Sequence, residues 1–129
     1  MRDVRLVMQR EHLVPGPDHP ITVEPTDRHV TVRVGDTVIA ETDSAVTLRE
    51  AGYDAVQYVP LDDVDPAVLR TSETTTYCPY KGEASYFDIA VGDDSVTDGV
   101  WTYTDPFPAV ADIRGHVAFY PDRVTVDAG

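Results

Sequence analysis

The chain has 129 residues, of which 42% are hydrophobic, and this composition indicates a globular domain and excludes a disordered protein. It has no apolar run of the roughly 18–20 residues that cross a bilayer, and Met1–Val4 does not open a signal peptide, so we expect a cytoplasmic protein with no membrane partner. The net charge is −13 and arginine and lysine form no cluster, which excludes a nucleic-acid partner because a phosphate-binding face needs such a cluster.

The N-terminal half predicts a loop followed by short strands. Residues 4–13 fit either a short helix or an early strand, and the prolines and glycine between positions 15 and 20 predict a loop. From Ile21 the hydrophobic residues alternate with a period of two, which is typical of half-buried strands. These strands are expected at 21–23, 30–34, 38–40, 46–48 and 56–60. Gly35 and Asp36 predict a tight hairpin between the second and third of them.

The C-terminal half predicts longer strands with one or two short helices. Asp65 before Pro66 predicts a helix N-terminus, with the helix running to Leu69 or Arg70. Extended segments are expected at 71–77, 84–91 and 100–103, followed by a helical turn at 109–113. Residues 117–120 should turn back and pair with 124–126. The pattern predicts an all-β, mainly antiparallel single domain over 1–129, with an N-terminal segment and loop (1–20) and a β domain (21–126).

The charged residues are dominated by aspartate among the acids and by arginine among the bases. Seventeen aspartates outnumber six glutamates, and nine arginines accompany a single lysine. These ratios favour adaptation to a high-salt cytoplasm, where the Debye length falls to roughly 3 Å and the mutual repulsion of the acids is screened. At low salt the same charges should destabilise the compact state.

The only cysteine and the only lysine are three residues apart, at Cys78 and Lys81. In a strand their side chains would face opposite sides about 10 Å apart, but Pro79 and Gly82 predict a turn that brings them together. An ammonium beside a thiol favours the reactive thiolate, and a desolvated lysine can form Schiff bases. The alternative is structural: a small buried cysteine closes the turn, and the lysine anchors it to Glu50 or Glu83.

Aromatic residues gather near this turn in the sequence, because nine of the eleven lie between Tyr77 and Tyr120. Lys81 with Tyr80, Tyr86, Trp101 and Tyr103 would form an apolar-walled pocket with one fixed charge, which is the usual form of a small-molecule site.

The other ionisable residues give weaker signals. His12, His19, His29 and His116 show no metal-ligand spacing, so we expect them to face solvent or to bond locally, and we expect no metal or cofactor. His116 is the best candidate general base if the site reacts, because its strand should lie beside the turn.

Several motifs occur together in the order typical of one family. The most specific is Thr76-x-Cys78-Pro79-Tyr80-Lys81-Gly82-x-Ala84-x-Tyr86. Supporting segments are Val38–Thr42, Leu48-x-Glu50, Tyr58–Pro60 with Asp63-Val64, Trp101-x-Tyr103-x-x-Pro106 and Gly115-x-Val117–Tyr120. On these motifs the chain, from about Ile21 to Val126, resembles the domain-of-unknown-function 427 family. It departs from the family at His116, where an aromatic is usual.

The resemblance implies a β-tent architecture, in which two antiparallel sheets lean together. Many β-tent proteins hold zinc between two cysteine pairs, which this chain lacks, so a zinc-free domain is expected. The family motifs add Glu50, Tyr58 and Thr76 to the candidate ligand-binding residues. The family is sometimes labelled nucleotidyltransferase-like, but the sequence contains no glycine-rich phosphate cradle to support that label.

Three functions remain open at this point. The leading hypothesis is a pocket for a small anionic or carbonyl-containing ligand. Its binding residues are Glu50, Tyr58, Thr76, Cys78, Tyr80, Lys81, Tyr86, Trp101 and Tyr103. The second hypothesis is a transferase-type enzyme with Cys78, Lys81 or His116 as candidate catalytic residues. The third is an interaction module in which an exposed sheet edge makes a homodimer.

Overall fold

The computed structural model describes residues 11–129, which form mainly antiparallel β-structure with short 3-10 helices. The strands are β1 (Ile21–Pro25), β2 (Val30–Val34), β3 (Thr37–Thr42), β4 (Val46–Glu50), β5 (Val56–Pro60), β6 (Leu69–Cys78), β7 (Gly82–Val91), β8 (Asp94–Thr102), β9 (His116–Phe119) and β10 (Thr125–Asp127). The 3-10 helices are η1 (Leu61–Asp63), η2 (Pro66–Val68) and η3 (Pro108–Ile113). The all-β prediction is confirmed, while the β-tent arrangement stays a prediction.

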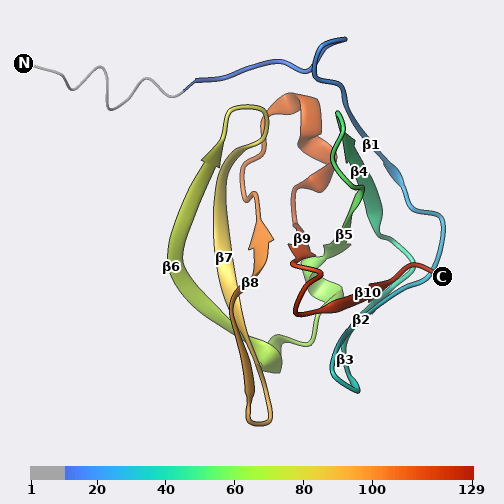
Figure 1. The fold of residues 1–129 in the computed structure, drawn as a ribbon, viewed down its shortest axis with the longest axis vertical. Helices are drawn as coiled ribbons and strands as arrows, with labels where there is room; N and C mark the ends of the chain where they lie inside the picture. The colour runs from blue at the N-terminus through green and yellow to red at the C-terminus, as the bar shows by residue number, and fades with distance from the viewer. Residues whose placement is uncertain (1–10) are drawn as a thin grey trace, which may run out of the picture.

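The strands form two sheets. The larger sheet has the order β1-β4-β5-β9-β8-β7-β6, and the smaller has the order β10-β2-β3 (Figure 1). Strand β9 is only four residues long and pairs with β5 at Val59–Val117 and with β8 at Val100–Phe119. It therefore joins two halves of the larger sheet, β1-β4-β5 and β8-β7-β6, which lie on opposite sides of it in Figure 1.

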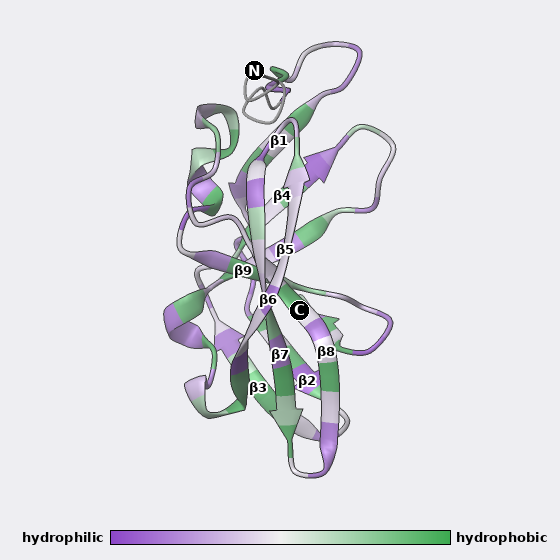
Figure 2. Ribbon diagram, turned by 90° about the vertical axis from the view of Figure 1, so that its left-hand side faces the viewer, coloured by the Kyte–Doolittle hydropathy of each residue, from purple (hydrophilic) through white to green (hydrophobic). Residues whose placement is uncertain are grey.

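Alternation of side chains explains why these segments are strands. In β2, Val30, Val32 and Val34 are buried, while the two residues between them are only half buried. The predicted hairpin is confirmed, because β2 ends at Val34, β3 begins at Thr37, and Gly35 adopts φ 59° in the turn. Figure 2 shows such a mixture of hydrophobic and hydrophilic residues along β8.

The helix predicted after Asp65 is shorter than expected. Asp65 does cap a helix, since its side chain accepts from the backbone N–H of Ala67, but η2 ends at Val68. Leu69 already pairs with Ile89 in the sheet, so the helix does not reach Leu69 or Arg70.

The predicted pairing of 117–120 with 124–126 is wrong. Backbone bonds from Arg123 and Val124 to the carbonyl of Tyr120 turn the chain away from β9. Strand β10 then pairs with β2, with Val126 opposite Val32, and completes the smaller sheet. The predicted turn is present, but the strand that follows it belongs to another sheet.

The residues 4–13, for which helix and strand were both open, lie mostly outside the described part of the chain. Residues 11–13 belong to neither kind of element. No helix in residues 11–129 is both long and apolar enough to cross a membrane.

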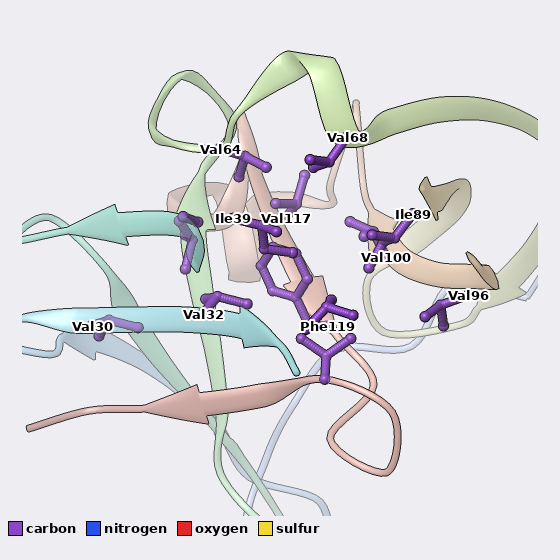
Figure 3. Close-up of a cluster of buried hydrophobic side chains, with 14 of the residues drawn as sticks. Val30, Val32, Ile39, Val64, Val68, Ile89, Val96, Val100, Val117 and Phe119 are labelled. Atoms are coloured by element: carbon purple, nitrogen blue, oxygen red, sulfur yellow. The ribbon is translucent and has the colours of Figure 1, made fainter. Parts of the chain in front are cut away.

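The buried side chains form two hydrophobic clusters. The first lies between the smaller sheet and strands β7 to β9, around the ring of Phe119 (Figure 3). The second contains Leu48, Tyr58, Ala84, Tyr103, Val110, Ile113 and Ala118. Three candidate site residues pack against this second cluster, which therefore supports the candidate site: Cys78, Tyr86 and Trp101.

Candidate functional site

The turn between β6 and β7 brings the single cysteine and the single lysine together. Cys78 pairs with Gly82, and the backbone N–H of Lys81 donates to the carbonyl of Cys78 at 3.2 Å. Gly82 adopts φ +114°, a conformation that L side chains rarely take, and lies against the carbonyl of Asp105. The Nζ of Lys81 consequently lies 3.7 Å from the Sγ of Cys78, on the same side of the turn.

Lys81 is buried and ion-paired. Its side chain is 10% exposed, and its Nζ donates to Oε1 of Glu50 at 2.5 Å. Glu50 ends β4 and is itself 14% exposed. Its second oxygen, Oε2, lies 2.7 Å from Nε2 of His19. The carboxylate therefore lies between a lysine and a histidine, with one oxygen bonded to each.

These partners decide the charge of Glu50. Burial alone would raise the pKa of this carboxyl, but the hydrogen bonds from Lys81 and His19 outweigh it and hold the pKa below its ordinary value. Glu50 is therefore a carboxylate at neutral pH. Together the lysine and the glutamate contribute no net charge to the site.

A cavity of about 400 Å³ opens above this ion pair. It lies between the two halves of the larger sheet, with walls from β4 and β5 on one side and from β7 and β8 on the other. Its lining residues are Leu48, Glu50, Tyr53, Val56, Tyr58, Lys81, Tyr86, Trp101, Tyr103 and Tyr120. Lys81 and Glu50 supply its charged groups, and aromatic rings supply most of its wall.

The aromatic rings are fixed relative to one another. The indole N–H of Trp101 donates to the hydroxyl of Tyr58 at 3.1 Å, and the two rings meet edge to face. The ring of Tyr120 lies 4.5 Å from that of Trp101. Burial raises the pKa of Tyr58 and Tyr103, and burial together with a hydrogen bond from its hydroxyl to Tyr86 raises the pKa of Tyr120 to about 12. The phenols of Tyr58, Tyr103 and Tyr120 therefore stay neutral through the physiological range.

The structure gathers most of the residues singled out from the sequence. Glu50, Tyr58, Lys81, Tyr86, Trp101 and Tyr103 all line the cavity. The other three lie just outside it. Cys78 contacts Nζ of Lys81 through its Sγ, the ring of Tyr80 stacks on His19 with centroids 4.1 Å apart, and the Thr76 hydroxyl lies 2.8 Å from that of Tyr86.

His116 does not belong to this group. It begins β9, opposite Pro60 of β5, and its Nδ1 lies 2.9 Å from the carbonyl of Arg114. The expectation that its strand lies beside the turn is wrong, because β9 pairs with β5 and β8 whereas the turn joins β6 and β7.

Sequence reasoning missed Tyr53, Tyr120 and His19. Tyr120 ends the Val117–Tyr120 motif, so the motif could have pointed to it, and Tyr53 lies in a loop with no pattern. His19 is 31 residues from Glu50, in the loop before β1, and nothing in its local sequence marks it.

Metal-binding groups do not gather here. In the described residues, no three histidine, cysteine, aspartate or glutamate side chains come together as metal ligands would.

Comparison with known protein families identifies the family to which the chain belongs. The model of the domain of unknown function DUF427 matches residues 22–128, which includes nearly all of the described chain and confirms the resemblance drawn from the motifs. A search of curated proteins found no match.

Proposed function

Because the chain belongs to the DUF427 family, whose description names no activity, we propose from the cavity alone that the protein binds a small molecule with an apolar ring and a carbonyl head. The observation that carries this proposal is the ion pair of Lys81 and Glu50, which is nearly buried and lines a cavity whose wall is mostly aromatic. The volume of the cavity, about 400 Å³, lies within the roughly 300–1,000 Å³ of ordinary ligand sites.

The charges of the site favour a carbonyl over an anion. An ammonium has three N–H donors, of which one goes to Glu50 and one to Sγ of Cys78, so Lys81 keeps one donor for a ligand oxygen. The positive charge itself is already balanced by Glu50 and lies within a protein of net charge −13. An anion would gain little attraction there, whereas a neutral carbonyl oxygen needs only the donor.

The walls favour a flat apolar ring. Trp101 and Tyr120 present rings to the cavity, and Leu48 and Val56 add aliphatic surface. A ring lying against them would displace water from apolar surface, while its head reaches Lys81.

Four probes that share one benzene ring test the proposal: benzamide, benzoate, benzylamine and toluene. Trp101 is the only tryptophan and lines the cavity, so its fluorescence reports binding directly. We expect saturable binding of benzamide, weaker binding of benzoate and toluene, and none of benzylamine, in buffer with molar KCl. If toluene binds as tightly as benzamide, the carbonyl head plays no part; if benzoate binds most tightly, the ligand class is anionic.

A pair of variants locates the binding. Lys81→Met should weaken benzamide binding about tenfold or more, the usual loss of a hydrogen bond from a charged donor. Arg70→Met is the matched control, since it also replaces a cation by methionine but lies on β6, where Arg70 bonds the carbonyls of Ala67 and Leu69. Equal benzamide affinity in wild type and Lys81→Met would refute the proposal.

The contact between Nζ of Lys81 and Sγ of Cys78 favours an enzyme as the second candidate. The amine of Lys81 is already engaged in an ion pair with Glu50, so Cys78 is the better candidate nucleophile. Alkylation of Cys78 by iodoacetamide should then be faster in wild type than in Lys81→Met. Equal rates would remove this candidate.

The homodimer stays a prediction. Light scattering tests it: a monomer at high protein concentration in high salt would dismiss the homodimer.

A further inference from the structure

The segment before β1 lies against the turn that carries Lys81. The backbone N–H of Leu13 donates to the carbonyl of Pro79 at 2.9 Å. The ring of His12 stacks on Phe107 with centroids 3.7 Å apart, and the ring of His19 stacks on Tyr80. Leu13 and His19 therefore contact the turn from outside the cavity, whereas His12 packs on Phe107, which lies outside the turn.

His19 is the member of this segment that reaches the ion pair. A bridge to Gly16 closes its loop, and the carbonyl of the next residue, Pro20, accepts from the N–H of Ala51, directly after Glu50. The histidine is thus tied to the strand end that carries Glu50. Its Nε2 lies 2.7 Å from Oε2 of Glu50, and its side chain is only 25% exposed.

The carboxylate of Glu50 needs this second partner to keep its orientation. Lys81 occupies Oε1, so loss of His19 would leave Oε2 without the partner it now has. A freed carboxylate could then turn both oxygens toward Lys81 and compete for the donor that Glu50 and Cys78 now leave unused. Within residues 11–129, the charged or titratable groups in contact with the His19 ring are Glu50 of β4 and Tyr80 of the turn, and Lys81 bonds the other oxygen of Glu50.

We propose that His19 is a positioning residue of the binding site: its Nε2–H holds Glu50 so that Lys81 keeps a donor free for the ligand. This inference rests on the proposed function. His19 lies outside residues 22–128, so the family match does not include it.

Two substitutions separate the donor from the ring. His19→Phe keeps a ring to stack on Tyr80 but removes the N–H, whereas His19→Gln keeps an N–H donor and removes the ring. We expect His19→Phe to weaken benzamide binding about tenfold and His19→Gln to stay within about threefold of wild type. His12→Phe is the matched control, because His12 also stacks on an aromatic ring but does not contact Glu50, and it should bind as wild type does.

The opposite ranking would overturn the proposal. If His19→Phe binds benzamide as wild type does, or if His19→Gln loses as much affinity as His19→Phe, the N–H donor has no positioning role. If His12→Phe loses as much as His19→Phe, the segment acts only by holding the turn, and the specific role of His19 is also refuted.

A measurement without ligand keeps the two proposals apart. Carbon-13 NMR of the glutamate carboxyls should show Glu50 titrating at higher pH in His19→Phe than in wild type, and close to wild type in His19→Gln. Absence of benzamide binding to wild type would refute the proposed function. If Glu50 titrates at the same pH in His19→Phe as in wild type, His19 does not position the Glu50 carboxylate, whatever the binding experiments show.

Discussion

Lys81 and Glu50 are nearly buried, so removal of either partner leaves a charge with poor access to water. We expect Lys81→Met and Glu50→Gln each to lower the free energy of unfolding by about 1–3 kcal/mol, measured by urea denaturation. The double variant should cost less than the sum of the two, because the second change removes the charge that the first left unpaired.

The exposed pair of Arg114 and Asp105 is the control for this prediction. Its side chains are 59% and 88% exposed, so Arg114→Met should change the free energy of unfolding by less than about 1 kcal/mol. Additive losses in the double variant of Lys81 and Glu50 would show that the two side chains do not interact in solution.

The ion pair also predicts a pH dependence of stability. The pKa of Glu50 is lower in the folded protein than its ordinary value of 4.5, because the bonds from Lys81 and His19 outweigh burial. Its contribution to stability is therefore complete above the unfolded pKa and is lost as the pH falls through the folded pKa. The stability difference between wild type and Glu50→Gln, measured in urea, should shrink below about pH 4.5. A difference that stays constant down to pH 3 or grows there would contradict this assignment.

At the scale of the element, the turn between β6 and β7 depends on Gly82. A side chain there would be strained at φ +114° and would meet the carbonyl of Asp105 at 3.4 Å. We expect Gly82→Ala to lower the free energy of unfolding by about 1–3 kcal/mol and to weaken benzamide binding, since the turn positions Lys81. Gly52→Ala is the control, because a Cβ at Gly52 would meet no atom within 4 Å and the backbone there has no positive φ. Equal stability of the two variants would show that the turn tolerates an ordinary residue.

Elements set by local sequence could be predicted, and those set by distant partners could not. Strands β2 and β3 follow from alternation and from Gly35, all within thirteen residues. Strand β10 pairs with β2 across more than ninety residues, and neither its period nor the turn before it carries information about that partner. The wrong placement of His116 has the same cause, because the neighbours of β9 are fixed by topology rather than by its own residues.

In the candidate site, too, local sequence predicts some residues, whereas others are brought in by distant parts of the chain. Cys78 and Lys81 could be placed together because Pro79 and Gly82 lie beside them, and the group of aromatics is visible as a cluster in the sequence. His19 could not be found, since a lone histidine in a proline-rich loop is normally solvent-exposed and its contact with Glu50 depends on the folded chain.

For the whole molecule, the net charge of −13 predicts stability that depends on salt. Repulsion among dispersed carboxylates should destabilise the fold at low ionic strength and be screened at molar salt. We expect Tm, measured by circular dichroism, to rise by several degrees between about 0.1 M and 2 M KCl.

A variant separates charge screening from general effects of salt. Asp36 and Asp93 are exposed turn residues, so Asp36→Asn with Asp93→Asn removes two charges without disturbing the core. The rise in Tm with KCl should be smaller in this variant than in wild type. A Tm that does not change with KCl in wild type would show that repulsion does not limit stability.

The proposed function depends on Lys81 holding the head of a ligand whose ring lies against Trp101. The indole N–H of Trp101 gives a single side-chain resonance, because the chain has one tryptophan and its N–H is bonded to Tyr58 at the cavity wall. Titration of benzamide into nitrogen-15-labelled protein should shift this resonance saturably in wild type and in Arg70→Met, and about tenfold more weakly in Lys81→Met. A resonance that does not move in wild type, or that moves equally in Lys81→Met, would contradict the role of Lys81.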